Sequence, residues 1–284
     1  MNYHTSDQVA DCVRSIRELS SGFNYEIIIV DNDSEPDLEA RFAADDCRVV
    51  MLPENVGFGR ANNAGFEVAR GRYLFCLNPD TVLLNNAVKI LLDFMEATPA
   101  AWACGANLYG ADMRPTHSFR RMLPGFFWEF DEFCNRRLEH RRFGADTVFN
   151  TTGRPLEVGY ITGADLMLRR DVIERIGGFD PDFFMYFEET DLCARIQAAG
   201  GKIYSVPEAR IQHLEGGSFE KVETVSEARI MRSEAGRRVY WRKHFNPLQR
   251  AAIGAVRLGT LLTRVILLPP SPKRTAWRLR LKAF

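Results

Sequence analysis

Asp80 is the first side chain in this sequence that is well placed for metal chemistry. It lies in Asn78-Pro79-Asp80, directly after the apolar run from Tyr73 to Leu77. A carboxylate at the end of a buried strand offers the oxygen ligand that Mg²⁺ or Mn²⁺ prefers, and such a metal is often shared with substrate phosphates. Because Asn, Pro and Asp are also standard turn residues, this segment alone fits a plain turn as well.

A second acidic group consists of Glu188, Glu189 and Asp191, which follow an aromatic run that begins at Phe183. Carboxyl groups packed beside aromatic rings are expected to have a raised pKa, as a general base requires. Two structural interpretations compete with this one. Asp191 and Arg195 have the i, i+4 spacing of a helix ion pair, and acidic residues in a first helical turn interact favourably with the helix dipole.

His213 is the third candidate, at the end of a short apolar segment and ahead of Gly216-Gly217-Ser218. A neutral imidazole can complete a metal site through one ring nitrogen. A histidine packed for structural reasons fits the same pattern, so His213 gains meaning only from its neighbours.

The elements that must position these residues alternate between strands and helices. Residues 26–30 and 73–77 are short apolar runs typical of buried strands, while 57–70 and 86–97 have helical patterns. This alternation predicts an α/β fold with a mainly parallel sheet. Ligands of such sheets bind outside the carboxyl ends of the strands, where Asp31-Asn32-Asp33 and Asn78-Pro79-Asp80 both lie.

Composition excludes several classes of protein. The chain has 284 residues, of which 46% are hydrophobic and 26% charged, which is typical of a globular protein. Its six cysteines form no C-x-x-C pair, so we expect reduced thiols instead of disulfides or a zinc site. Residues 57–65 lack the G-x-G-x-x-G fingerprint after a strand, which argues against a dinucleotide-dependent oxidoreductase.

The C-terminal segment differs in charge from the rest of the chain. It contains no Asp or Glu from Ala235 to Phe284, although the whole chain has equal numbers of acidic and basic residues. Within the apolar stretch 251–268, Arg257 and Arg264 continue a seven-residue spacing from Arg250, so the three share one helical face. We therefore predict that 247–284 is a basic, amphipathic helical tail that contacts an anionic membrane surface. A helix packed on the catalytic domain or on a partner subunit is the alternative, and no recognised nucleic-acid module is present.

Ordered motifs along the chain resemble those of the family 2 glycosyltransferases, and within them the bacterial rhamnosyltransferase-like group. The resemblance runs from Asn2 to about Phe245. The motifs that carry it are Asn2-Tyr3-His4, Val30-Asp31-Asn32-Asp33-Ser34, the segment from Asn55 to Gly65, Leu77-Asn78-Pro79-Asp80-Thr81, Thr162-Gly163-Ala164 before Gly177-Gly178-Phe179-Asp180, the segment from Tyr186 to Arg195, and the segment from His213 to Ser218.

The resemblance implies a GT-A fold over residues 1–246 and a role for each motif. On the donor side, Tyr3 is expected to stack on the nucleobase, Asp31 to hydrogen-bond the base or ribose, and Arg60 to lie near the diphosphate. Asp80 is expected to bind a Mg²⁺ or Mn²⁺ ion with the help of His213. Glu189 is the implied general base, with Glu188 and Asp191 orienting it and the acceptor. The remaining implied contacts are Asp33, Asn63 and Asn78 on the donor side and Gly163, Ala164 and Asp165 on the acceptor side.

The sequence departs from the family pattern at two places. Asn78 stands where the family has the first acid of its D-x-D motif. This difference is expected to affect how the donor is held and not how the metal is bound. The family pattern also begins with a buried apolar strand just before the N-Y pair, whereas this sequence begins at Met1-Asn2-Tyr3. The first strand is therefore not among these residues.

The resemblance implies an inverting glycosyltransferase that moves a sugar, L-rhamnose from dTDP-L-rhamnose, onto a glycan or lipid-linked glycan acceptor in cell-surface polysaccharide synthesis. Two alternatives stay open: a UDP-hexose or UDP-galactofuranose transferase of the same fold, and a non-catalytic glycan-binding relative. The first twelve residues have no apolar signal-peptide core. We therefore expect a cytoplasmic protein at the inner face of the cell membrane.

Overall fold

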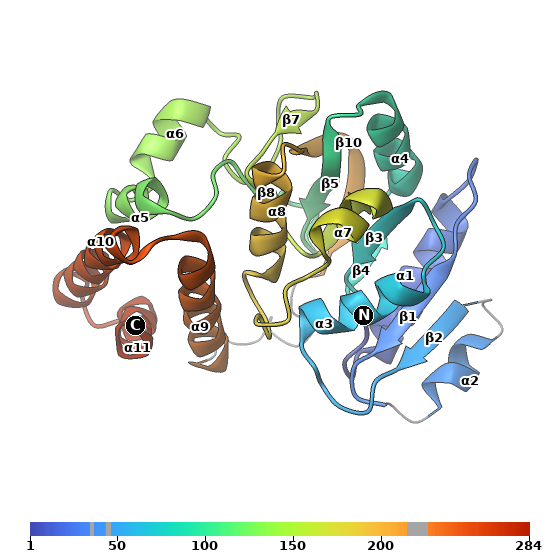
Figure 1. The fold of residues 1–284 in the computed structure, drawn as a ribbon, viewed down its shortest axis with the longest axis horizontal. Coiled ribbons are helices and arrows are strands. Elements are labelled where there is room, and N and C mark those ends of the chain that lie inside the picture. The colour runs from blue at the N-terminus through green and yellow to red at the C-terminus, as the bar shows by residue number, and fades with distance from the viewer. Residues whose placement is uncertain (35–36, 44–46, 215–226) are drawn as a thin grey trace.

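The computed structural model describes residues 1–34, 37–43, 47–214 and 227–284 (Figure 1). The elements of the first half are α1 (Ser6–Leu19), β1 (Ile27–Asp31), α2 (Leu38–Phe42), β2 (Cys47–Met51), α3 (Phe58–Val68), β3 (Tyr73–Leu77), β4 (Thr81–Leu83), α4 (Ala87–Ala97), β5 (Ala101–Tyr109), β6 (Phe119–Arg120), α5 (Phe126–Phe133) and α6 (Arg137–Phe143). Those of the second half are β7 (Leu156–Glu157), β8 (Tyr160–Ile161), β9 (Asp165–Arg169), α7 (Arg170–Ile176), α8 (Glu188–Ala198), β10 (Lys202–His213), α9 (Glu227–His244), α10 (Pro247–Leu267) and α11 (Pro272–Ala283).

The main sheet has the strand order β3-β9-β5-β10-β4, with β7 paired to β10. β5 and β10 run parallel, but β9 lies antiparallel between β3 and β5, and β4 is antiparallel to β10. The sheet is thus mixed, and the expectation of mainly parallel pairing is wrong for it. An apolar run shows that a strand is buried on both faces, but it does not show in which direction that strand enters the sheet.

Helices cover both faces of this sheet. α1 and α4 pack on one face, over a core that includes Leu91, Met95 and Leu108. α7, α8 and Phe66 of α3 pack on the other face, over a core that includes Leu168 and Leu192. The six cysteines are free thiols, as their scattered positions predicted. The three layers leave the strand ends accessible as a place for polar side chains.

β1 and β2 form a separate parallel pair beside the main sheet (Figure 1). A cavity of about 530 Å³ lies between them and the main sheet, lined by residues 27–30 of β1 and 73–77 of β3. Asn2 enters this region from the N-terminus. It bridges Asp31 in parallel, donates its N–H to the Val30 carbonyl at 2.7 Å, and accepts from the Asn32 N–H at 2.9 Å.

α5, α9, α10 and α11 form a helical unit at the end of the molecule that lies away from β1 and β2 (Figure 1). The expected boundary between residues 246 and 247 falls between α9 and α10, so this unit combines the C-terminal tail with two earlier helices. In the described part of the chain, no helix is long and apolar enough to cross a membrane.

The basic face of α10 turns inward, which corrects the prediction that it faces a membrane. The Arg257 side chain is fully buried and pairs with Glu132 at 3.1 Å and with Glu234 at 2.5 Å. Arg264 donates to the backbone carbonyl of Glu132 at 3.1 Å. The seven-residue spacing correctly places the arginines on one face, but the acidic residues Glu132 and Glu234 on earlier helices determine where that face points.

Candidate active site

The turn after β3 brings Asp80 to His213. The Asn78 N–H donates to the Ala164 carbonyl at 2.9 Å, and the Thr81 hydroxyl donates to the Asn78 carbonyl at 2.7 Å, which fixes the turn. β4 then pairs antiparallel with the end of β10, with Thr81 opposite His213. As a result, Oδ1 of Asp80 lies 3.3 Å from Nε2 of His213.

This pair fits a divalent metal that is shared with a substrate. One carboxylate oxygen and one imidazole nitrogen suit Mn²⁺ or Mg²⁺, and both side chains are largely shielded from solvent. Within the residues that the structure describes, no third His, Cys, Asp or Glu joins them as a cluster. A metal ion at this pair would need further ligands from outside the described residues. Residues 215–218 of the histidine motif lie outside the described residues.

Glu188 and Glu189 begin α8, after a loop with an unusual backbone. Tyr186 and Phe187 both have left-handed conformations, with φ of 72° and 77°, which aromatic residues rarely adopt. The Tyr186 carbonyl packs against Gly236 of α9, where an added Cβ would lie only 2.3 Å away. The strained loop is therefore held from outside, and it sets where α8 starts.

Burial raises the pKa of both carboxyls. Burial is the largest cause for Glu188, and the charge of Glu189 adds to it, whereas the pKa of Glu189 is raised by burial and partly lowered by nearby hydrogen-bond donors. Among the described residues, Oε2 of Glu188 has no hydrogen-bond partner. Glu188 is buried and the adjacent Glu189 is half-buried. Two interacting acids in such surroundings favour one proton between them, which leaves one carboxylate able to accept a proton from a substrate.

The acidic pair and the metal turn are joined through residues 163 and 164. A Cβ built on Gly163 would lie 3.2 Å from the Phe58 ring, which leaves little room for a larger residue, and 3.8 Å from Cβ of Glu189, which is an ordinary contact distance. The next residue, Ala164, holds the Asn78 N–H. Gly163 therefore lies beside Glu189, and the next residue, Ala164, is hydrogen-bonded to the turn that carries Asp80.

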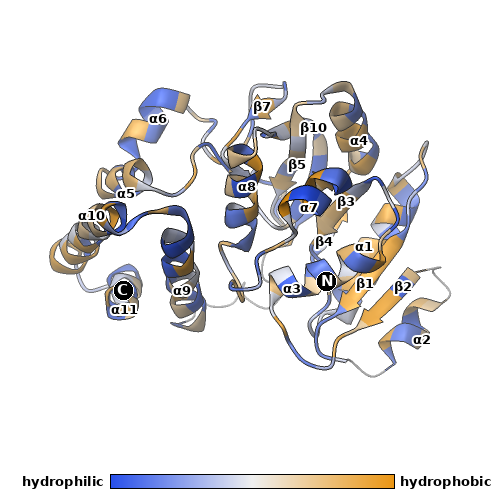
Figure 2. Cartoon of the chain, viewed as in Figure 1, coloured by the Kyte–Doolittle hydropathy of each residue, from blue (hydrophilic) through white to orange (hydrophobic). Residues whose placement is uncertain are grey.

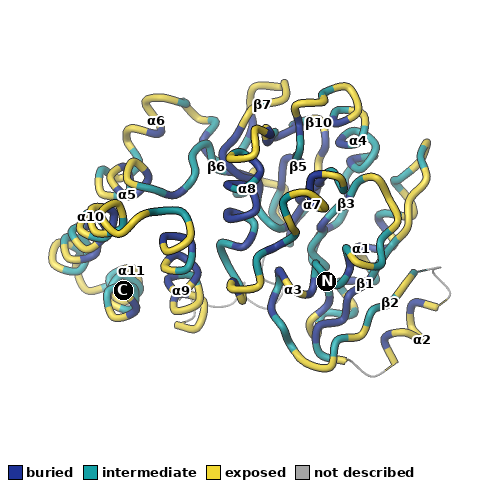
Figure 3. Tube along the Cα trace, viewed as in Figure 1, coloured by how far each residue is buried: buried dark blue, intermediate teal, exposed yellow. Residues whose placement is uncertain are grey.

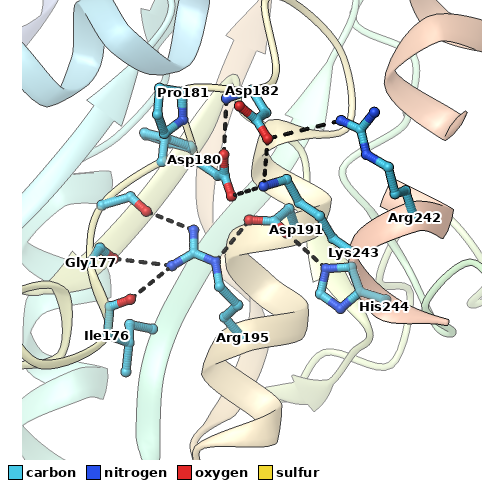
Figure 4. A network of polar contacts seen from close by, with 12 residues as sticks. Ile176, Gly177, Asp180, Pro181, Asp182, Asp191, Arg195, Arg242, Lys243 and His244 are labelled. Atoms are coloured by element: carbon cyan, nitrogen blue, oxygen red, sulfur yellow. Dashed lines mark hydrogen bonds and ion pairs between the residues drawn. The ribbon is translucent and has the colours of Figure 1, made fainter. Parts of the chain in front are cut away.

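Asp191 lies in a network of polar contacts shown in Figure 4. Its carboxylate accepts from Nε of Arg195 at 2.8 Å and contacts Nε2 of His244 at 2.7 Å (Figure 4). Arg195 also donates to backbone carbonyls of the loop before α8, including Gly178 at 2.6 Å. The expected i, i+4 ion pair is present. Through these contacts Asp191 links α8 to α9 and to this loop. Because Glu188 and Glu189 belong to the same helix, the contacts also help to fix their position.

The expected donor-side residues gather around the end of β1. Asp31 is fully buried and accepts from the Asn2 amide at 2.9 Å. Asp33 contacts Nε2 of His4 at 2.8 Å, and the Tyr3 ring lies 4.6 Å from the His4 ring. Tyr3 remains substantially exposed, as a ring that stacks on a base requires.

Arg60 and Asn63 on α3 contact the loop that precedes α8. Nε of Arg60 donates to the Pro181 carbonyl at 3.0 Å. The Asn63 amide donates to the Phe179 carbonyl at 2.7 Å and accepts from the Phe179 N–H at 2.9 Å. The structure therefore gives Asn63 a different role from the expected donor contact: it clamps α3 to the backbone of residue 179.

Asp165 does not face an acceptor, which corrects that expectation. It is fully buried as the first residue of β9, opposite Leu77, and its Oδ2 accepts from the Ala106 N–H at 2.5 Å. Burial raises its pKa well above the usual range of an aspartate. The carboxyl is an internal part of the sheet because the chain passes directly from Gly163 and Ala164 into β9.

Sequence reasoning missed the contacts that hold the donor-side loops. The Asn32 amide donates to Oδ1 of Asn55 at 3.0 Å and accepts from the Val56 N–H at 3.0 Å. The Phe58 N–H donates to the Phe184 carbonyl at 3.0 Å, next to Gly57 with φ of 89°. Asn55 and Gly57 stand in the quoted N-x-G segment, so the signal was present, but its partner at residue 184 is far away in the sequence.

Comparison with known proteins agrees with this arrangement. The chain is 27% identical over 187 residues to N-acetylglucosaminyl-diphospho-decaprenol L-rhamnosyltransferase from Mycobacterium tuberculosis, which covers 58% of each chain. It is 25% identical over 163 residues to the rhamnosyltransferase WbbL of Escherichia coli, covering 53% of this chain and 58% of that protein. The chain therefore matches little more than half the length of these relatives.

Two solved structures show the same fold at low sequence identity. The mannosyltransferase PcManGT from Pyrobaculum calidifontis, in complex with GDP-Man and Mn²⁺, aligns over 99% of this chain and 81% of its own with a TM-score of 0.57 and 13% identity. GalNAc-T7 with UDP, GalNAc and Mn²⁺ aligns over 84% of this chain and 48% of its own with a TM-score of 0.55 and 14% identity. These are GT-A glycosyltransferases, so the predicted fold is confirmed. Since residues 1–177 match the description "Glycosyl transferase family 2", the chain belongs to that family.

Proposed function

We propose that this protein is a metal-dependent, inverting glycosyltransferase that moves L-rhamnose from dTDP-L-rhamnose onto a glycan or lipid-linked glycan acceptor. One observation carries the proposal: Asp80 meets His213, and Gly163 and Ala164 lie between the turn of Asp80 and the acidic pair of buried Glu188 and half-buried Glu189. A diphosphate-binding group and a candidate base are then available to one donor sugar. The two named rhamnosyltransferase relatives support the choice of sugar.

The proposed reaction is a single displacement at the anomeric carbon. Glu189 takes the proton of the acceptor hydroxyl while that oxygen forms the new bond to the anomeric carbon. The bond from this carbon to the diphosphate breaks on the opposite face, so the configuration inverts and the nucleoside diphosphate leaves. The raised pKa of both carboxyls favours one proton shared by the pair, and the proposed mechanism uses the ionised form of Glu189.

The remaining residues bind and orient. Asp80 and His213 would hold the Mg²⁺ or Mn²⁺ ion, which supplies positive charge for the departing diphosphate. Tyr3 and Asp31 hold the nucleoside at the end of β1, with Asp33 close by. Asn78 orients the sugar from the turn after β3, and Arg60 lies at the open side of α3. Gly163 and Ala164 leave room for the acceptor beside Glu189.

A UDP-hexose or UDP-galactofuranose donor is the alternative within the same chemistry, since Tyr3 and Asp31 would hold uracil as well as thymine. The proposed setting is the synthesis of a cell-surface polysaccharide at the inner face of the cell membrane. The name of the mycobacterial relative, which carries a diphospho-decaprenol acceptor, supports a lipid-linked acceptor here.

A thermal-shift panel tests the proposal. The donors are dTDP-rhamnose, UDP-glucose, UDP-galactose, UDP-N-acetylglucosamine and GDP-mannose, each with and without Mn²⁺. A ligand that binds only the folded state raises the melting temperature by mass action. We expect a Mn²⁺-dependent rise with dTDP-rhamnose that Asp80→Ala abolishes. A folded protein whose melting temperature responds to none of these donors would favour a non-catalytic relative.

A further inference from the structure

Two neighbouring helices of the helical unit, α5 and α10, are reversed in polarity relative to ordinary surface helices. Glu129 of α5 and Arg257 of α10 are buried, whereas many apolar residues of both helices are exposed. Figures 2 and 3 colour the two helices by hydropathy and by burial. A surface helix of a globular protein normally buries its apolar face and exposes its charges. α5 and α10 contact each other, so their exposed apolar faces together need a partner that covers them.

On α5 the outward face is aromatic. Phe126, Phe127, Phe130 and Phe133 are all exposed, and Phe127 retains 76% of its accessible surface. Glu129, in contrast, is fully buried and pairs with Arg237 of α9. Four exposed phenylalanines in eight residues are far from the scattered apolar residues found on any protein surface.

On α10 the outward face is aliphatic and carries no charge. Leu258, Leu262 and Ile266 are exposed at helical spacing, and Leu248 lies further along the same side. Ile266 and the adjacent Leu267 keep 69% and 78% of their surface. The opposite side holds Arg257, which is buried against the acids of α5 and α9. The apolar stripe therefore runs most of the length of a helix that cannot cross a membrane.

The charges of the helical unit indicate which kind of partner covers the exposed apolar faces of α5 and α10. Glu129, Glu132 and Glu234 pair with Arg237, Arg257 and Arg280, so the buried charges balance inside the unit. Outside it, Lys273, Arg278 and Lys282 of α11 are exposed, and residues 235–284 contain no acid to offset them. In the described part of the chain, these three cations have no ion pair. A second copy would present the same positive charge, which repels, whereas an anionic bilayer offers the opposite charge beside an apolar interior.

We infer that the outward faces of α5 and α10 insert shallowly into an anionic lipid bilayer, with the cations of α11 against the headgroups. The contact surface differs from the one predicted from the basic stripe of α10, because that stripe is used inside the protein. Acyl chains take the place of the protein core that these apolar faces lack.

This surface lies close to the candidate base. Trp128, on the inner side of α5, packs on Tyr160 with ring centroids 6.3 Å apart. Burial raises the pKa of Tyr160, and the charge of Glu189 adds to this rise, so Tyr160 lies between α5 and the acidic pair. A lipid-linked acceptor would therefore present its sugar near Glu189 while its lipid stays in the bilayer. That consequence rests on the proposed function, whereas the docking itself does not.

Co-sedimentation with vesicles tests the inference without any sugar nucleotide or turnover. The vesicles contain either phosphatidylcholine alone or phosphatidylcholine with roughly 30% phosphatidylglycerol, which gives the surface a negative charge. We expect binding to the anionic vesicles that weakens as NaCl is raised, because screening shortens the reach of the α11 cations. The double variant Phe127→Ser/Ile266→Ser should lose binding by about tenfold or more, since each serine removes buried apolar area.

Matched variants separate the outcomes. Met113→Ser changes a similarly exposed apolar residue elsewhere and should bind like the parent. Lys273→Gln/Arg278→Gln/Lys282→Gln should remove the preference for anionic lipid. Equal binding by the parent and Phe127→Ser/Ile266→Ser would overturn the inference. It would also fail if no vesicle bound and the parent formed a dimer that the same double variant abolished, because a second copy would then be the occupant. If the parent protein bound vesicles but no nucleotide sugar, the proposed function would be contradicted and the inference on membrane binding would stand.

Discussion

Glu189 carries the proton transfer in the proposed mechanism, so its carboxylate is the residue whose loss should matter most. Glu189→Gln keeps the size of the side chain but cannot accept the proton. We expect turnover to fall by ~10²–10⁴-fold with little change in donor affinity. Glu208→Gln, at an exposed glutamate, is the control and should keep full turnover. Steady-state kinetics and donor titration make the comparison, and an active Glu189→Gln enzyme would remove this residue from the mechanism.

The pKa of Glu189 sets the acid side of the pH profile. Burial raises this pKa, and the base must be ionised to work. Turnover should therefore fall as pH decreases through a value above the ordinary glutamate pKa of about 4.3. The measurement is kcat against pH, with the melting temperature recorded at each pH to exclude unfolding. An acid limb at the ordinary glutamate value would contradict the buried environment of the base.

Asp165 gives a residue-scale test of the correction made above. Because its pKa is raised, the folded protein keeps this proton while the unfolded chain releases it, so stability decreases as pH rises above the ordinary aspartate range. Asp165→Asn removes that cost and can still accept from the Ala106 N–H. We expect its melting temperature to equal or exceed that of the parent at pH 7 and the difference to shrink towards pH 4. An acceptor contact would instead appear as a raised KM with unchanged stability.

At the residue scale, the sequence predicted Asp80 and His213 together because their motifs come in the family's order. The sequence did not show that Asp165 has a different position and role from Gly163 and Ala164. Gly163, Ala164 and Asp165 are consecutive, yet the first borders Glu189 while the third is inside the sheet. The difference arises because β9 begins at Asp165, so Gly163 and Ala164 lie before the sheet, and the sequence did not show where this strand starts.

At the scale of elements, α3 and the loop before α8 are held together at Gly57. Its φ of 89° is left-handed, and an added Cβ would lie 2.2 Å from the Phe184 carbonyl oxygen. Gly57→Ala therefore combines backbone strain with displacement of the loop that leads to Glu188. We expect it to be less stable than the parent by at least about 2 kcal/mol, within the range for strained residues.

Gly200→Ala is the matched control for this loop. Gly200 also has a positive φ, 93°, but nothing lies within 4 Å of its added Cβ. Urea denaturation of both variants isolates the cost of the contact with Phe184 from the cost of the backbone conformation. Equal losses of stability in the two variants would mean that the contact with residue 184 contributes nothing.

Strand and helix positions were largely predictable at this scale, because apolar runs and helical spacing are local signals. The pairing was not. β9 inserts antiparallel between β3 and β5, and β10 extends to His213, well past the strand visible as a short apolar run. β1 and β3 are not paired with each other, and a cavity of about 530 Å³ is lined by residues of both strands.

At the scale of the whole molecule, buried ion pairs join the C-terminal helices to the rest of the protein. Arg257 of α10 is fully buried between acids of α5 and α9. Arg257→Ala would leave these carboxylates without their cation, so we expect a loss of about 3–5 kcal/mol in unfolding free energy. Arg278→Ala, at an exposed arginine of α11, should change it by less than about 0.5 kcal/mol. Chemical denaturation compares the two, and a mild effect of Arg257→Ala would mean that the tail is only loosely attached.

The tail also shows what helical periodicity leaves open. Spacing identified the face of α10 that carries Arg250, Arg257 and Arg264, but it does not say whether a charged face meets solvent or other charges. Glu132, 125 residues before Arg257, decides that question through a pairing of distant segments. Local patterns predict faces, whereas their partners emerge only from the fold.

Sugar transfer by the intact protein tests the central claim most directly. The assay supplies dTDP-L-rhamnose, Mn²⁺ and a polyprenyl-diphosphate-linked N-acetylglucosamine acceptor, and mass spectrometry detects the added sugar. We expect a product that depends on Mn²⁺, disappears with EDTA, and is lost in both Asp80→Ala and Glu189→Gln. Transfer that persists without metal or in the Glu189→Gln variant would contradict the account, as would a folded protein that transfers no sugar from any nucleotide donor.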